Sequence, residues 1–113
     1  MKLRLARGSL RLRVSAAEVR ALAARGRIEE RIALHPERAL ALRLSIARDA
    51  ERLRVVYEGD VIDVQLPESD ARAWCASDLV ALEAPASTGA ASLRILVEKD
   101  FDAPDSDPPG AGG

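Results

Sequence analysis

The sequence predicts an α+β domain in which a ββαββ unit occurs twice. About eight short, mainly antiparallel strands would then form a barrel-like sheet with two short helices. Several segments alternate apolar and charged residues with period two, which is typical of half-buried strands. A segment with helical spacing of apolar residues follows the second strand of each unit. The apolar helix positions Val19 and Leu22 recur 52 residues later as Ala71 and Trp74, which indicates a duplication.

The first unit covers residues 1–49. Its four expected strands are Lys2–Ala6, Leu10–Val14, Arg27–Leu34 and Ala39–Ala47. Ser15 and Glu18 have the spacing of a capping box, in which each side chain accepts the backbone N–H of the other residue. Gly26 is placed to end this helix, because glycine readily adopts the left-handed backbone conformation. The short links favour antiparallel pairing of neighbouring strands.

The second unit covers residues 50–101. Its four expected strands are Leu53–Tyr57, Val61–Leu66, Leu79–Ala84 and Leu93–Glu98. Pro67 opens the second helix, since proline is tolerated in a first turn. Trp74 takes the place that Leu22 has in the first unit, so we predict that Trp74 packs onto the sheet. Cys75 follows on the same face, where we expect it to act as a small buried apolar residue.

The composition indicates one globular domain. The chain has 113 residues, of which 48% are hydrophobic, and this is too short for two ordinary domains. Residues 102–113 contain Pro, Gly and Asp but no large apolar side chain. We therefore expect a single domain over residues 1–101, followed by a disordered acidic tail.

Charge is divided unevenly along the chain. Residues 1–54 carry a net charge of +8 and residues 55–113 a net charge of −9. The two halves either attract each other within one fold or leave a basic face for a polyanion or for self-association. No apolar run is long enough to span a membrane, and the N-terminus lacks a signal peptide. We expect a cytoplasmic protein without membrane contact.

Residues for catalysis are few. His35 is the only histidine and lies in an expected turn, and Cys75 is the only cysteine, so we predict no catalytic set, no metal site and no disulfide. The chain has no glycine-rich loop that would hold a phosphate, and no cofactor is predicted. These features favour a non-enzymatic domain, although they leave the question of enzymatic activity open.

Charged side chains near the expected strand ends are the candidate ligand-binding residues. They would line one mouth of the barrel: Arg11, Arg13, Glu30, Glu98, Lys99 and Asp100. Glu30 follows Glu29 on a strand, so one of the two should face inward. Salt bridges at the rim would explain the same residues more simply.

The first expected hairpin is strongly basic. It carries five cations and no acid: Lys2, Arg4, Arg7, Arg11 and Arg13. Alternation places these cations on a common sheet surface, which would suit a nucleic acid. The chain has only three aromatic residues, however, and no strand with the pattern of a base-stacking surface. Nucleic-acid binding is therefore disfavoured.

Five stretches stand out together. They are Lys2–Arg4, Gly8–Arg13, Ser15 with Glu18, Trp74 with Asp78, and the more specific Leu93–Phe101 with the sequence LRILVEKDF. They resemble a family of short, uncharacterised bacterial proteins that form a domain of unknown function. The resemblance covers residues 1–101 and implies a bacterial origin and a single domain, with no activity, cofactor or site. Members of that family have a cysteine soon after the last stretch, where this chain has Asp102, Ala103 and Pro104.

The sequence thus leaves three functions in order of preference. The first is a small non-enzymatic binding or interaction domain whose partner is unknown, a second copy of the chain included. The second is a small enzyme or a binder of a charged metabolite at a barrel mouth. The third is a nucleic-acid-binding regulator that uses the basic hairpin.

Overall fold

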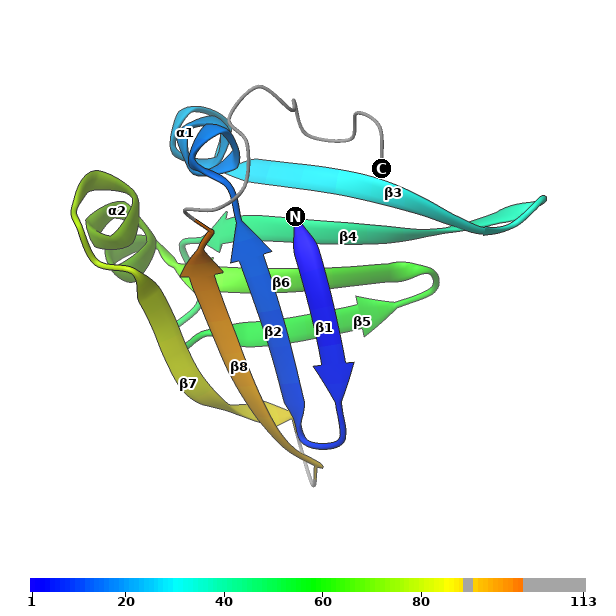
Figure 1. Cartoon of the computed structure of the whole chain (residues 1–113). Coiled ribbons are helices and arrows are strands. Elements are labelled where there is room, and N and C mark those ends of the chain that lie inside the picture. Colours follow the sequence, from blue (N-terminus) through cyan, green and yellow to red (C-terminus); the bar gives the residue numbers. More distant parts are fainter. Residues whose placement is uncertain (89–90, 101–113) are drawn as a thin grey trace.

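The computed structural model describes residues 1–88 and 91–100, and the predicted tail of residues 102–113 lies outside them. The described part confirms the α+β class with eight strands and two helices (Figure 1). In chain order the elements are β1 (Lys2–Ala6), β2 (Ser9–Val14), α1 (Ala16–Arg25), β3 (Arg27–His35), β4 (Arg38–Ala47), β5 (Arg54–Glu58), β6 (Val61–Pro67), α2 (Glu68–Ala76), β7 (Ala81–Thr88) and β8 (Ala91–Lys99). Neither helix in these residues is long and apolar enough to cross a bilayer.

The predicted strands are present, but within the described part of the chain they form two four-stranded sheets and do not close into one barrel-like sheet. In the described residues the first sheet has the order β1-β2-β8-β7 and the second the order β3-β4-β6-β5, without closure into a barrel. The first hairpin of each half pairs with the second hairpin of the other half. The central pairs β2–β8 and β4–β6 are parallel, and the four hairpin pairs are antiparallel. Each sheet therefore keeps two edge strands.

The two halves are built alike. The β1–β2 register, with Lys2 opposite Arg13, recurs 52 residues later in β5–β6, where Arg54 lies opposite Gln65. The parallel pairs also correspond, with a shift of one residue in the second strand, because Leu10 lies beside Ile95 and Ile62 lies beside Leu42. This agreement supports the predicted duplication of a ββαββ unit, which itself stays a prediction.

Helix α1 begins and ends at the predicted residues. The Ser15 hydroxyl accepts the backbone N–H of Glu18 at 3.2 Å, and the Glu18 carboxylate accepts the backbone N–H of Ser15 at 3.0 Å. The predicted capping box is thus confirmed. Gly26 follows with a φ of 79°, and its N–H donates to the carbonyl of Leu22 at 2.8 Å, which ends the helix.

The apolar core contains side chains of both sheets and both helices. Its largest fully buried members are Trp74, Leu12, Leu22, Leu42, Leu44, Leu66, Ile95, Val14, Val64 and Val97. The two helices follow β2 and β6 and lie side by side at one end of the sheets (Figure 1). Trp74 is 0% exposed, which confirms its predicted burial. Cys75 is half-buried, so it is less covered than predicted.

Candidate functional site

Four of the predicted basic residues gather on the outer face of the first sheet. The register places Lys2 opposite Arg13 and Arg4 opposite Arg11. Leu10 and Leu12 alternate with these arginines along β2 and lie buried in the core. We call Lys2, Arg4, Arg11 and Arg13 the basic patch. Like charges that lie directly opposite each other on two strands destabilise a sheet unless they are compensated.

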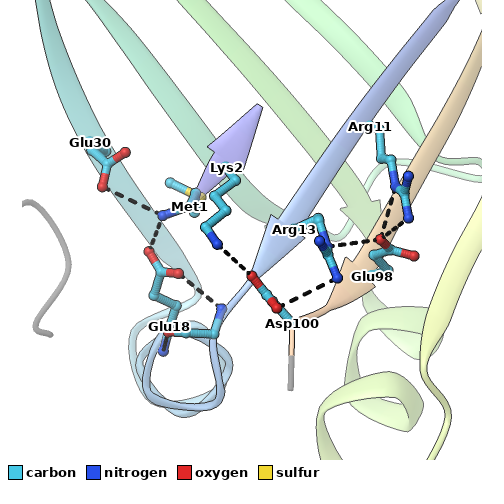
Figure 2. Close-up of polar contacts among 9 residues, drawn as sticks. Met1, Lys2, Arg11, Arg13, Glu18, Glu30, Glu98 and Asp100 are labelled. Carbon is cyan, nitrogen blue, oxygen red and sulfur yellow. Dashed lines mark hydrogen bonds and ion pairs between the residues drawn. The ribbon is translucent and has the colours of Figure 1, made fainter. Parts of the chain in front are cut away.

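Two carboxylates at the end of β8 compensate these cations (Figure 2). Glu98 accepts from Nε of Arg11 at 2.9 Å and forms an ion pair with Nε of Arg13 at 3.1 Å. Asp100 forms ion pairs with Nζ of Lys2 at 3.2 Å and with Nη2 of Arg13 at 3.5 Å. The Glu98 side chain is 14% exposed and that of Asp100 is 2% exposed. The acids are therefore buried beside cations that reach solvent.

The other two predicted ligand-binding residues lie elsewhere. Glu30 faces inward, as predicted for one of the Glu29–Glu30 pair, and its carboxylate lies 3.5 Å from the amino group of Met1 (Figure 2). Lys99 donates to the backbone carbonyl of Ser77 at 2.6 Å, and its Nζ lies 5.6 Å from the centroid of the Trp74 ring. The structure thus brings together Arg11, Arg13, Glu98 and Asp100 but not Glu30 or Lys99.

A second feature, which sequence reasoning missed, is an apolar groove of about 940 Å³ between the two sheets. Its aliphatic walls consist of Leu5, Leu10, Leu34, Ala39, Leu40, Val55, Ile62 and Leu93. Except for Val55, which lies at the start of β5, these residues lie towards the ends of the strands away from the helices. Leu5 is 58% exposed, and Leu34 and Tyr57 are each 71% exposed. Large apolar side chains that gather in a hollow at the surface mark a binding site.

Polar groups occupy one part of the groove wall. His35 and Arg38 belong to the β3–β4 hairpin, and Asp60 belongs to the β5–β6 turn. Arg38 donates to Asp60 at 2.6 Å, and this hydrogen bond and charge raise the pKa of Arg38, which keeps it cationic. The backbone N–H of Glu37 donates to Nδ1 of His35 at 3.1 Å. The neutral imidazole must then carry its proton on Nε2, which is free to donate.

The signal that would have revealed the groove is weak. Leu34 and Tyr57 look like ordinary core residues of a strand, because each ends a short apolar run, Ile32–Leu34 and Val55–Tyr57. Both lie shortly before a turn, at the end of a strand, where the strand extends beyond the elements that cover its side chains. An apolar residue at a strand end is thus the feature that distinguishes them.

We expect Cys75 to react slowly with thiol reagents. Burial raises the pKa of its thiol, while the nearby cations Lys99 and Arg72 oppose this with a smaller effect. The reactive thiolate is therefore scarcer in the folded protein than in the unfolded chain at any pH near neutrality. Alkylation by iodoacetamide at pH 7.5, followed by mass spectrometry, should proceed at least several times faster in urea than in buffer. Equal rates would contradict the burial of this thiol.

Comparison with protein families matches residues 1–108 to the family described as "Family of unknown function (DUF7009)". No curated protein and no solved structure matches the chain.

Proposed function

We propose that this chain, which belongs to DUF7009, a family of unknown function, is a small non-enzymatic binding domain that holds an aliphatic chain with an anionic head group. The observation that carries the proposal is the apolar groove with three mostly exposed large side chains, Leu5, Leu34 and Tyr57. A bacterial origin and a cytoplasmic location stay predictions.

The size and the walls of the groove support an aliphatic ligand. Sites for small molecules have volumes of roughly 300–1,000 Å³ and are mostly apolar with a few polar groups. The groove volume of about 940 Å³ falls in this range, and its walls come from seven strands. Each methylene that leaves water contributes about 0.8 kcal/mol, so a chain that fills the groove gains affinity with length.

The polar groups support an anionic head. Nε2 of His35 can donate a hydrogen bond. Arg38 lies in the same part of the groove wall, and its raised pKa keeps it positively charged. The charge of Arg38 is partly balanced by Asp60, but a guanidinium has five N–H donors and the bond to Asp60 uses only Nη2. A carboxylate at the end of an aliphatic chain would take up the remaining donors.

Binding should therefore depend on both chain and head. In isothermal titration calorimetry we expect affinity to rise about tenfold from hexanoate to octanoate and again to decanoate, because two methylenes are buried at each step. Decyltrimethylammonium should bind more weakly than decanoate, because its cation faces Arg38. If affinity does not change with chain length, the ligand does not bind in the apolar groove. If decanoate and decyltrimethylammonium bind equally well, His35 and Arg38 do not recognise the head group.

A pair of matched variants locates the site. Leu34→Asn removes a side chain that a ligand would cover, and we expect decanoate to bind about tenfold more weakly. Leu79→Asn is the control, because Leu79 is another exposed leucine, at 47%, and does not line the groove. Both positions are exposed, so neither variant should alter folding by more than about 0.5 kcal/mol. Equal losses in the two variants would contradict the proposal.

A second copy of the chain is the competing occupant of the groove mouth. Size-exclusion chromatography with light scattering at low and high salt separates the two cases. We expect a monomer at every concentration, since the groove holds a small ligand. A dimer that Leu34→Asn converts to a monomer would show that another copy covers the mouth, and would overturn the assignment of a ligand.

A further inference from the structure

We propose that the basic patch binds the phosphate groups of a small molecule, at a site separate from the groove. The patch lies on the outer face of the first sheet, whereas Leu10, which follows the opposite alternation on β2, lines the groove. A hollow of about 230 Å³ lies at the patch. Its lining consists of Lys2, Leu3, Arg4, Arg11 and Arg13.

The strand register concentrates positive charge on this hollow. Lys2 and Arg13 are direct partners across the hairpin, and so are Arg4 and Arg11. With the two neighbouring carboxylates, Glu98 and Asp100, these four cations keep a net charge of +2. The acids are nearly covered, while the side chains of Lys2, Arg11 and Arg13 are each at least 38% exposed, so the positive groups are the ones that meet solvent.

The buried acids also hold the cations in place. Glu98 contacts both Arg11 and Arg13, which fixes two guanidinium groups side by side. Each guanidinium has five N–H donors in a planar fork, and such forks bind phosphate oxygens in pairs. Because the side chains are already ordered, an anion that binds here loses less of its affinity to conformational entropy. The carboxylates thus preorganise the site rather than only neutralise it.

Arg4 is the fourth cation of the basic patch, and its guanidinium group is available to a ligand. Within residues 1–88 and 91–100 it has no ion-pair partner, in contrast to Lys2, Arg11 and Arg13. The described lining contains no aromatic ring on which a base could stack. These features favour a phosphate group over a nucleic-acid strand.

Titration of the protein with inorganic pyrophosphate at low salt, followed by amide NMR shifts, tests the site. We expect the largest shifts in β1 and β2, and about fivefold weaker binding in Arg4→Gln. Arg31→Gln is the matched control, because Arg31 is an exposed arginine of the other sheet without an ion-pair partner in the described residues, and it should bind as the natural chain does. Scattered shifts, or equal losses in the two variants, would overturn the proposal.

A second variant separates a built site from general attraction to positive charge. Glu98→Gln raises the net charge of the patch by one unit but loosens Arg11 and Arg13. Preorganisation predicts about twofold weaker binding of pyrophosphate, whereas general attraction predicts tighter binding and would overturn the proposal. ADP should bind within about threefold of pyrophosphate, since only phosphates are recognised. Binding of a single-stranded oligonucleotide without binding of pyrophosphate would also overturn it.

Discussion

Replacement of Trp74 by alanine should lower the free energy of unfolding by about 3–5 kcal/mol. The side chain is 0% exposed and belongs to the main apolar core. Its Nε1–H donates to the backbone carbonyl of Val80 at 3.0 Å, which ties α2 to the start of β7. The variant leaves a large cavity and an acceptor without its partner. Urea unfolding followed by circular dichroism measures the loss.

Two control variants should lose less stability than Trp74→Ala. Leu79→Ala truncates an exposed side chain close to α2 and should cost less than about 1 kcal/mol. Trp74→Phe keeps an aromatic ring but removes the bond to Val80, so its cost should lie between the two. In the natural chain Trp74 should fluoresce at short wavelength and resist quenching by iodide. A loss below 1 kcal/mol in Trp74→Ala, with emission quenched freely, would contradict the burial.

Replacement of Glu18 by alanine should lower the free energy of unfolding by about 2 kcal/mol. The Glu18 carboxylate makes two contacts. Its Oε1 accepts the backbone N–H of Ser15 in the capping box, and its Oε2 lies 2.6 Å from the amino group of Met1. The Glu18 side chain is 6% exposed and Met1 is half-buried, so removal of the carboxylate leaves the amino group with only the more distant Glu30 at 3.5 Å. Thermal and urea unfolding would measure the loss.

Matched variants divide this cost between its two sources. Glu18→Gln keeps an oxygen for the N–H of Ser15 but removes the negative charge. We expect it to recover the part that belongs to the helix cap, about 1 kcal/mol. Glu29→Ala removes a carboxylate of the same kind from an exposed pair with Arg43, and should cost less than about 1 kcal/mol. If Glu18→Ala costs no more than Glu29→Ala, the buried pair does not stabilise the fold as described.

Local features of the fold could be predicted from the sequence, because they depend on neighbouring residues. Alternation predicted the first two strands, strand-like segments between turn residues predicted the other six, and the capping box placed the start of α1 at Ala16. The burial of Trp74 followed from helical spacing and from its correspondence with Leu22 in the first unit. The pairing of β2 with β8 could not be predicted in this way, because the residues that meet, such as Leu10 and Ile95, lie 85 positions apart. The two-sheet arrangement was therefore missed.

The candidate site likewise has parts that the sequence predicted and parts that it did not. Alternation predicted that Arg11 and Arg13 share a face, and the end of β8 supplied the acids that pair with them. The structure places Lys99 apart from them, since consecutive strand residues point to opposite faces and Glu98 already lies on the outer one. The groove depends on how the two sheets diverge away from the helices, a property that no single strand encodes.

The most direct test of the proposed function is the place of a bound aliphatic chain in the groove. Tyr57 is the only tyrosine of the chain, so its ring protons can be identified without ambiguity. We expect NMR to show intermolecular Overhauser effects between the methylene protons of decanoate and the Tyr57 ring, together with the methyl groups of Leu5 and Leu34. Effects to other residues alone, with decanoate bound to saturation, would contradict a ligand in the groove.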